Sequence, residues 1–358
     1  MAESPLELSK KPGAVLGLPD SPDSTVAWHY GDPLTEQRNA LANGAVIDRS
    51  NRFLITITGP ERLSWLNTIS SQLVTGLGNG ESAENLILDV NGRVEHHFVL
   101  TDIGETVWID TEGSRGPDLL KYLQRMVFWA KVEVSAAEDY VLLSLVGPVK
   151  LPEILHRPYE ATKFAGGFIR MMPWPTNPAY DVVIPRANLE DVWRELHLSP
   201  AGMWTYEAFR VAALKARLGV DTDEKTIPHE ANWIGGVDEL GAVHLNKGCY
   251  RGQETVARVH NLGKPPRRLV LLHLDGSSDE RPATGDAVTA AGRVVGRVGT
   301  VVDHFEYGPI ALALIKRNVP ADTALTIGTT AAAIDADSYH DDDRVQPGRA
   351  AIERLRGR

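Results

Sequence analysis

The chain has 358 residues, 43% of them hydrophobic and 23% charged, and its formal net charge at pH 7 is −10. This length exceeds the roughly 250–300 residues that one hydrophobic core can serve, so two or three domains are expected. No apolar stretch approaches the ~18 residues of a membrane span, and the first residues lack the apolar segment of a secretory signal. We therefore expect a cytoplasmic protein with no membrane partner.

The acidic balance and the single cysteine exclude further classes of protein. Binding to nucleic acid depends mostly on Lys and Arg that neutralise phosphates, so the net charge argues against nucleic acid as a partner, although a local basic patch remains compatible with it. One cysteine, Cys249, cannot form an internal disulfide, and no CxxC or paired Cys/His spacing is present. We therefore expect no resident metal site, and any iron–sulfur cluster would have to belong to a partner.

The first predicted elements follow a lead-in with little regular pattern. Residues 1–30 are rich in Pro, Gly, Ser and Asp and have no hydrophobic period, which predicts a poorly ordered or extended lead-in that ends near residue 40. Apolar residues then alternate along 53–57, as in a half-buried strand. Thr58 and Glu61 have the spacing of a capping box, so a helix is predicted to begin at Thr58 and to continue to Leu73.

A hairpin, further strands and a helix are predicted between residues 85 and 147. Two apolar runs flank Asn91-Gly92, a dipeptide that favours the tight turn of a β-hairpin. Strands are also predicted at 106–110, at "KVEVS" and at "YVLLSLVG", and an apolar helical stripe covers 117–128. Short hairpins with few helices favour an α+β sheet with helices on one side over regular βαβ winding.

The second half of the chain changes from helices to short strands. Asn188 is predicted to cap a helix, and a further helix is predicted from 204 to 218, ending at Gly219. From Arg268 onward, short strands separated by Gly and Pro predict a separate all-β barrel or sandwich of ~90 residues. The glycines at 292, 296 and 299 lack the spacing of a nucleotide-binding loop, so we interpret them as strand glycines at a bend.

Residues 247–268 form a basic segment in an acidic protein. Six cations and one anion, Glu254, give this segment a net charge of +5. The six are Lys247, Arg251, Arg258, Lys264, Arg267 and Arg268. Such a cationic island attracts an anionic ligand or an acidic partner surface. The alternative is that these side chains pair with carboxylates of the protein itself.

Cys249 lies within this basic segment. Neighbouring cations favour the thiolate form of a cysteine, which is the form that acts as a nucleophile or as a soft metal ligand. Glycines on both sides allow the backbone to approach a ligand closely. The alternative is a buried cysteine that packs as a small hydrophobic residue.

The segment "KGCYRGQE", residues 247–254, resembles the signature KGC(F/Y)xGQE of the YgfZ family of tetrahydrofolate-binding proteins. That family is part of the larger family of the glycine-cleavage T-protein, an aminomethyltransferase. The resemblance extends from "DRSNRFLITITGPERLSWLNTISSQ" through "RVAALKARLGVDTDEKTIPHE" into the C-terminal strands.

The resemblance implies an α+β cloverleaf of three domains. Two mixed α/β domains would surround a central folate opening, and a β-barrel would follow them. We accordingly expect a lead-in at 1–40, a folate-binding region of two interleaved subdomains at 41–264, a barrel at 265–335 and a charged tail at 336–358.

The resemblance also implies roles for single residues. Cys249 and Lys247 become the candidate reactive pair, in a loop at the rim of the opening. Candidate folate contacts in and beside the signature are Gly248, Tyr250, Gly252, Gln253, Glu254 and Arg258. The segment "TIPHE" resembles the TPxE segment of the T-protein, which makes Glu230 a candidate partner of the pterin, since a carboxylate can accept two hydrogen bonds from an aminopyrimidinone edge. The alternative is a buried Glu230 paired with Arg258 or Lys247.

Two positions depart from the pattern of the transferases. Arg210 matches the arginine of the pattern RxEAG, but the acid of that pattern is Ala212 in this chain. The transferases carry an Asp-Asp pair after the first hairpin, one member of which polarises the folate at its reacting nitrogen, and this chain has Glu95-His96 there. A glutamate displaces the carboxylate by about one methylene, and such displacements are costly in catalysis. Candidates for stacking on the pterin are Phe53, Trp204 and Tyr206, for each of which a place in the core is the alternative.

The sequence supports one leading function and two alternatives. In the leading one, a YgfZ-type protein binds tetrahydrofolate, polyglutamylated forms included, and uses Cys249 to support assembly or repair of iron–sulfur clusters in client enzymes or with cluster-assembly proteins. The basic segment would then hold the glutamate tail of the folate or an acidic client surface. The first alternative is a folate-dependent aminomethyltransferase or demethylase, which the Glu95-His96 departure disfavours. The second is an RNA-interaction role of the basic segment, whose mark would be steep salt dependence.

Overall fold

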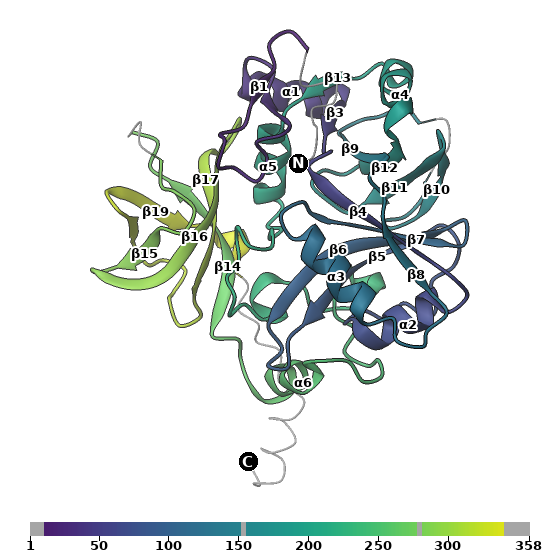
Figure 1. Cartoon of the computed structure of the whole chain (residues 1–358). Coiled ribbons are helices and arrows are strands. Elements are labelled where there is room, and N and C mark those ends of the chain that lie inside the picture. Colours follow the sequence, from purple (N-terminus) through teal and green to yellow (C-terminus); the bar gives the residue numbers. More distant parts are fainter. Residues whose placement is uncertain (1–10, 152–154, 278–280, 340–358) are drawn as a thin grey trace.

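The fold consists of two β-sheets with helices and a C-terminal β-barrel (Figure 1). It is seen in a computed structural model that describes residues 11–151, 155–277 and 281–339. The mixed α/β architecture with a C-terminal barrel, as predicted, is confirmed. In the described part of the chain, no helix is both long and apolar enough to cross a membrane.

The first sheet has five antiparallel strands in the order β5-β6-β7-β4-β8. Its strands are β4 (Arg52–Thr58), β5 (Glu81–Leu88), β6 (Val94–Ile103), β7 (Thr106–Glu112) and β8 (Glu133–Ala136). Helices α2 (Arg62–Ile69) and α3 (Gly116–Arg125) bury Leu66, Leu119 and Leu123 in a core with the apolar side chains of this sheet. The predicted hairpin at Asn91-Gly92 is confirmed, with Gly92 at a φ of 76°.

The second sheet has six strands in the order β10-β11-β12-β9-β3-β13, and only the β3–β13 pair is parallel. The strands are β3 (Ala45–Asp48), β9 (Tyr140–Val146), β10 (Ala161–Phe164), β11 (Gly167–Met172), β12 (Ala179–Pro185) and β13 (Ser199–Ala201). The turn η2 (Arg186–Asn188) leads into α4 (Leu189–Leu196), which packs on this sheet. The two sheets meet through a smaller core that contains Leu54 and Phe168.

The barrel closes in the order β14-β17-β16-β15-β18-β19. Its strands are β14 (Arg267–Leu274), β15 (Ala287–Ala290), β16 (Arg293–His304), β17 (Gly308–Lys316), β18 (Leu325–Ile327) and β19 (Thr330–Ile334), followed by η5 (Ala336–Ser338). Gly296 and Gly299 lie within β16, which confirms that they are strand glycines. Gly292 does not, because it lies in the turn that precedes β16, with a φ of 76°. The rest of the predicted charged tail, 340–358, lies outside the described residues.

Helix α5 (Met203–Ala212) and the segment after it join the three parts. Figure 1 shows α5 between the barrel and the six-stranded sheet. The segment from 213 to 266 contains η3 (Pro228–Ala231), η4 (Val237–Glu239) and α6 (Gln253–Leu262). One core combines Val94 of the first sheet, Val211 of α5, Trp233 of this segment and Leu312 of the barrel, so these parts are packed as one body.

The lead-in is folded where the structure describes it, which corrects the sequence prediction. Strands β1 (Val15–Leu16) and β2 (Ala27–His29) pair, and α1 (Pro33–Asn43) begins after Asp32, whose side chain accepts hydrogen bonds from the amides of residues 34 and 35. Asp23 and Val26 are buried. The sequence shows no hydrophobic period in these elements, because they are short and are held by contacts with distant parts of the chain.

The ends predicted for three helices are also corrected. Helix α2 begins at Arg62 rather than Thr58, because Gly59 turns the chain at a φ of 107° and the Glu61 carboxylate accepts from the amide of Lys131 instead of closing a capping box. The same helix ends at Ile69 rather than Leu73. The side chain of Asn188 does not cap α4 and donates to the carbonyl of residue 165. Helix α5 ends at residue 212, well before the predicted Gly219, because the chain turns at residue 214 with a φ of 54°.

Candidate functional site

The cysteine loop, residues 247–252, is anchored at one end by Lys247. Its ammonium donates to three backbone carbonyls at the end of α2, those of Asn67 (2.6 Å), Ser70 (2.6 Å) and Gln72 (3.0 Å). All three of its N–H donors are therefore used, at a helix C-terminus that favours a cation. Burial lowers the pKa of Lys247 to about 8. The structure thus corrects the predicted reactive role of Lys247, which ties the loop to α2.

The other end of the cysteine loop rests on the turn of the first hairpin. Gly252 has a φ of 83°, and a Cβ placed there would lie 2.6 Å from the carbonyl oxygen of Asp89. Next to it, Arg251 forms an ion pair of 2.9 Å with Glu95 at the start of β6. Between these two anchors, Gly248 and Cys249 are exposed. The loop therefore presents its thiol to solvent from a backbone held at both ends, and the buried-cysteine alternative is wrong.

The remaining residues of the signature support the loop. Tyr250 is buried in the core shared with the barrel, and the Gln253 amide faces the carbonyl of Lys247 at 3.4 Å. Glu254 and Arg258 are exposed on α6. None of these four side chains lines the cavity that lies beside the loop.

Most cations of the basic segment have partners within the protein, as the alternative interpretation held. Lys247 and Arg251 are engaged as described, Arg267 binds Glu230 and Asp223, and Arg268 donates to the carbonyl of residue 317. Within the described residues, no ion pair is found for Arg258 or Lys264. The six cations therefore do not form one free patch for an anionic ligand.

Glu230 does not face an open site. Its side chain is fully buried on η3, and both carboxylate oxygens accept from Arg267, at 2.8 and 2.7 Å. A further bond comes from the amide of Ile227. The predicted pterin contact is corrected to a buried ion pair, whose partner is Arg267 rather than the Arg258 or Lys247 considered from the sequence.

Arg210 is also committed to the protein interior. Its five N–H donors meet Glu207 twice, Asp221, the carbonyl of Lys215 and the hydroxyl of Thr300 on the barrel. No donor remains for a pterin. Arg210 therefore fastens α5 to the barrel, which corrects its predicted role as a ligand contact.

The three aromatic candidates for stacking lie in packed surroundings. Phe53 lies against Gly116, where an added Cβ would overlap its ring. The ring of Tyr206 is covered by the guanidinium of Arg49 at 3.7 Å, and Trp204 donates from its indole to the carbonyl of Asp303. The structure corrects these three candidates to core or interface residues.

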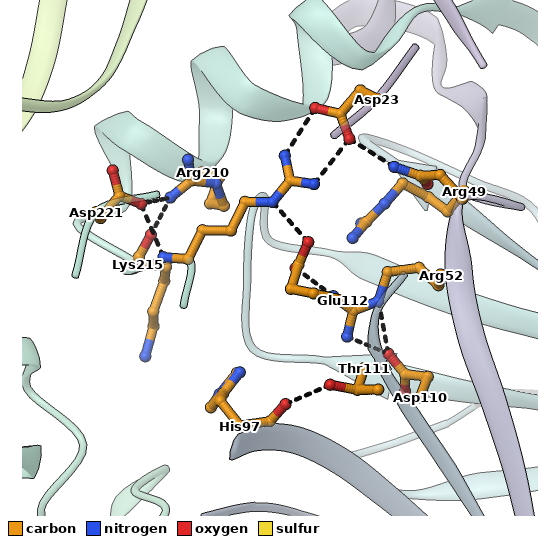
Figure 2. A network of polar contacts seen from close by, with 12 residues as sticks. Asp23, Arg49, Arg52, His97, Asp110, Thr111, Glu112, Arg210, Lys215 and Asp221 are labelled. Carbon is orange, nitrogen blue, oxygen red and sulfur yellow. Dashed lines mark hydrogen bonds and ion pairs between the residues drawn. The ribbon is translucent and has the colours of Figure 1, made fainter. Parts of the chain in front are cut away.

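A buried network of charges occupies the junction of the two sheets, the lead-in and α5 (Figure 2). Arg217 binds Asp23 of the lead-in with two hydrogen bonds, of 2.7 and 2.8 Å, and Glu112 of β7 with one of 2.8 Å. Arg52 binds the same Glu112 and Asp110. Burial alone would raise the pKa of Glu112, but the neighbouring arginines outweigh it and lower this pKa to about 2. The sequence analysis predicted none of these five residues for the site, because they come from distant segments of the chain.

A cavity of about 830 Å³ lies beside the cysteine loop. Its walls are the start of β6, one face of α3, the segment 218–224, Arg251 of the loop and Arg297 of the barrel. Arg251 and Glu95 form their ion pair on this wall, so the loop and the cavity share a contact. Of the predicted site residues, only Glu95 lines the cavity.

His96 is a buried polar residue on the wall of this cavity. Its side chain is 9% exposed, and its Nδ1 atom is buried without a hydrogen-bond partner. Burial, helped by the nearby Arg115, lowers the pKa of His96 to about 4, so the imidazole is neutral at physiological pH. A buried polar atom without a partner is rare in proteins, and its place on a cavity wall fits contact with a ligand or a water.

The wall contributed by α3 was not predicted from the sequence. Arg115, Asp118, Lys121, Tyr122 and Arg125 line the cavity, three or four residues apart along the helix. This spacing places them on one face of the helix. The helical spacing of these polar side chains is visible in the sequence, but the predicted stripe at 117–128 contains only the apolar residues of the helix.

Comparisons with known proteins agree with this architecture. Residues 267–338 match the family model described as the CAF17 C-terminal β-barrel domain. A tRNA-modifying protein YgfZ of Aliivibrio fischeri is 26% identical over 294 residues, which cover 79% of this chain and 88% of that protein. A chloroplastic protein of Arabidopsis thaliana, named as a transferase, is 23% identical over 82% of this chain and 69% of its own length. The crystal structure of the glycine cleavage system aminomethyltransferase T from Bartonella henselae has the same fold, with a TM-score of 0.78, 19% identity and coverage of 91% of this chain and 94% of that one.

Proposed function

Because the chain is a YgfZ-type member of the superfamily of the glycine-cleavage T-protein, we propose that it binds a reduced folate in the cavity beside the cysteine loop. We further propose that Cys249 supports assembly or repair of iron–sulfur clusters in client enzymes. The observation that carries the proposal is the shared wall of cavity and loop, where Arg251, two residues from the thiol, binds Glu95 at 2.9 Å.

The cavity fits a folate in size and in chemistry. A volume of about 830 Å³ lies within the roughly 300–1,000 Å³ that small-molecule sites occupy. Tyr122 offers a ring, and His96 offers an unpartnered nitrogen to the polar edges of the ligand. The cations of α3 match the carboxylates of a glutamate tail. These residues take the roles that Glu230 and Arg210 cannot take.

The thiol is suited to a partner-facing role. Cys249 is exposed, and its backbone is fixed between the end of α2 and the hairpin turn. Among the described residues, no cluster of His, Cys, Asp and Glu could hold a metal ion, so a cluster or its components would come with the partner. The relatives named tRNA-modifying proteins lead us to include enzymes that modify tRNA among the proposed clients.

The alternative, a folate-dependent transferase, has less support. It needs a free carboxylate near the reacting nitrogen, but Glu95 is paired with Arg251 and the neighbouring His96 is a neutral imidazole. Turnover of a methylamine-bearing or lipoyl-bound donor with tetrahydrofolate, abolished by Glu95→Gln, would establish this alternative instead.

The proposal is tested by separating ligand binding from thiol function. Calorimetry should give the same affinity for tetrahydrofolate in the wild type and in Cys249→Ala. A strain that carries only Cys249→Ala should lose activity of cluster-dependent enzymes and of cluster-dependent tRNA modification, while Cys249→Ala protein accumulates to the wild-type level. Normal activities in that strain would refute the role of the thiol. Absence of tetrahydrofolate binding by the wild type would refute the folate assignment.

A further inference from the structure

The loop between α3 and β8 presents two aromatic side chains to solvent, and we call residues 126–132 the aromatic loop. Trp129 is 97% exposed and Phe128 is 75% exposed, whereas the apolar side chains on both sides of them pack against the core of the first sheet. Phe128 has a φ of 43°, a left-handed conformation that a bulky residue keeps only where its surroundings hold it. A strained backbone that keeps two large apolar groups in water is typical of a docking site.

Helix α2 holds the aromatic loop in place. The indole of Trp65 donates to the carbonyl of Met126 at 2.9 Å, and the Glu61 carboxylate accepts from the amide of Lys131 at 2.9 Å. A loop that is ordered before it docks loses little conformational entropy on binding, so its aromatic side chains can contribute fully to an interface. Two exposed cations, Arg125 and Lys131, flank the aromatic pair, and within the described residues no ion pair is found for either of them.

A pocket of about 520 Å³ lies at the other end of α2, and we call it the acidic pocket. Its apolar wall includes Leu73, exposed at the rim, and Leu77, both in the segment that follows the helix. A pocket of this size can hold a drug-sized molecule, so an indole and a phenyl ring fit into it together. Because α2 is eight residues long, or about 12 Å, the aromatic loop and the acidic pocket lie close to each other on the surface.

The charge of the acidic pocket is opposite to that of the aromatic loop. Glu81, Asp238, Glu239 and Arg157 give its wall a net charge of −2 when histidine is counted as neutral. Arg157 pairs with Glu81. In the part of the chain that the structure describes, no ion pair is found for Asp238 or Glu239, and both side chains are exposed. These two carboxylates are therefore available to cations of another molecule.

We propose that the aromatic loop of one copy of this chain inserts into the acidic pocket of a second copy, reciprocally, in a two-fold dimer. The insertion places Arg125 and Lys131 of one copy against Asp238 and Glu239 of the other. This inference does not depend on the proposed folate and thiol functions. It does bear on the cysteine loop, because Asn246, which lines the acidic pocket, lies three residues before the thiol in the sequence.

The area that a dimer needs favours reciprocal insertion over a single one. Two aromatic side chains of about 150–250 Å² each, together with the pocket that receives them, bury roughly 800 Å², which is the size of a weak contact. Two such insertions bury roughly 1,600 Å², the size of a stable interface. A two-fold arrangement also closes the assembly, whereas one-sided insertion generates open chains of molecules.

Sedimentation equilibrium of the full-length protein between about 1 and about 100 μM tests the proposal. The wild type should be a dimer whose association weakens as salt is raised, because salt screens the flanking charges. Trp129→Ala should raise the dissociation constant of the dimer at least about a hundredfold, since a two-fold dimer loses this contact twice. Val294→Ala, at an exposed apolar residue of the barrel, is the matched control and should leave the dissociation constant unchanged.

A mixture of two variants tests whether the acidic pocket receives Trp129. Gly76 lines this pocket, and no atom lies within 4 Å of a Cβ placed there, so Gly76→Trp fills the pocket without disturbing the fold. Gly76→Trp and Trp129→Ala should each associate weakly. An equal mixture should associate more strongly than either variant alone, because the mixed dimer keeps one of the two insertions. Circular dichroism of each variant verifies its fold.

Each other outcome overturns a defined statement. A wild type that stays monomeric throughout this range would refute the dimer. Binding of that monomer to phosphatidylglycerol vesicles, lost in Trp129→Ala, would then assign the aromatic pair to a membrane surface. Open polymers in place of dimers would refute the reciprocal two-fold arrangement. A mixture that associates no better than its two components would refute the acidic pocket as the acceptor of Trp129.

Discussion

The ammonium of Lys247 lies 2.6 Å from the backbone carbonyl oxygen of Ser70, 177 residues earlier in the chain. The cysteine loop is thereby attached to the end of α2, and all three N–H donors of the ammonium are used in this contact. This contact explains why a lysine directly precedes the exposed Gly248–Cys249 pair: it fixes the direction in which the loop leaves the core.

Lys247→Met should destabilise the protein. The substitution leaves three carbonyl oxygens, two of them buried, without their donor, and each buried group of this kind costs about 1–3 kcal/mol when nothing replaces its partner. We expect the free energy of unfolding in urea to fall by about 2–4 kcal/mol, since water will satisfy part of the loss. Lys264→Met, at an exposed lysine, should change it by less than about 0.5 kcal/mol. Equal effects of the two substitutions would contradict the anchoring role.

The two glycines that flank the thiol should respond differently to alanine. Gly252 has a φ of 83°, and a Cβ there would lie 2.6 Å from a backbone oxygen, so Gly252→Ala should cost about 1–3 kcal/mol and loosen the loop. Gly248 has an ordinary φ and no atom within 4 Å of an added Cβ, so Gly248→Ala should be tolerated. Hydrogen exchange of amides 248–252 should quicken only in Gly252→Ala. Similar exchange in both variants would show that the hairpin turn does not hold the loop.

Local patterns in the sequence predicted the fold better than they predicted the site. The alternation along 53–57 and the Asn91-Gly92 turn depend on neighbouring residues, and both were predicted correctly. The contacts that set the surroundings of the candidate residues join distant parts of the chain. Arg217, for example, donates to Asp23, which lies 194 residues away in the sequence. The residue type alone could not predict that Glu230 forms a buried ion pair with Arg267, because a carboxylate can bind an arginine and a pterin equally well.

Asp23→Ala should weaken the junction between the lead-in and the rest of the protein. The Asp23 carboxylate is buried and receives two hydrogen bonds from Arg217, and removal of one partner from a buried ion pair costs about 3–5 kcal/mol. Because Arg217 keeps Glu112, we expect a loss of about 3 kcal/mol, at the lower end of this range. Asp20→Ala, at an exposed position of the same lead-in, is the matched control and should leave the free energy of unfolding unchanged. Limited proteolysis should cut within residues 11–30 sooner in Asp23→Ala alone.

The buried imidazole of His96 should make stability fall as the solution becomes acidic. Its pKa is about 4 in the folded protein and about 6.5 in the unfolded chain, so between these values the unfolded state binds more protons. The free energy of unfolding therefore decreases as pH falls from about 6.5 to about 4, by up to about 3 kcal/mol from this group. The charged groups that face it from α3 act in opposite directions, Arg115 lowering this pKa and Asp118 raising it.

His96→Gln separates this contribution from the other acid-sensitive groups. His229, whose pKa burial also lowers to about 4, remains in the variant and gives the same slope in both proteins. We therefore expect the difference in unfolding free energy between wild type and His96→Gln to shift in favour of the variant as pH falls from 6.5 to 4, and to stay constant above pH 7. Urea denaturation at half-unit steps of pH measures it. Parallel curves would mean that the imidazole is solvated, and the cavity wall would then lack the buried polar contact proposed for the ligand.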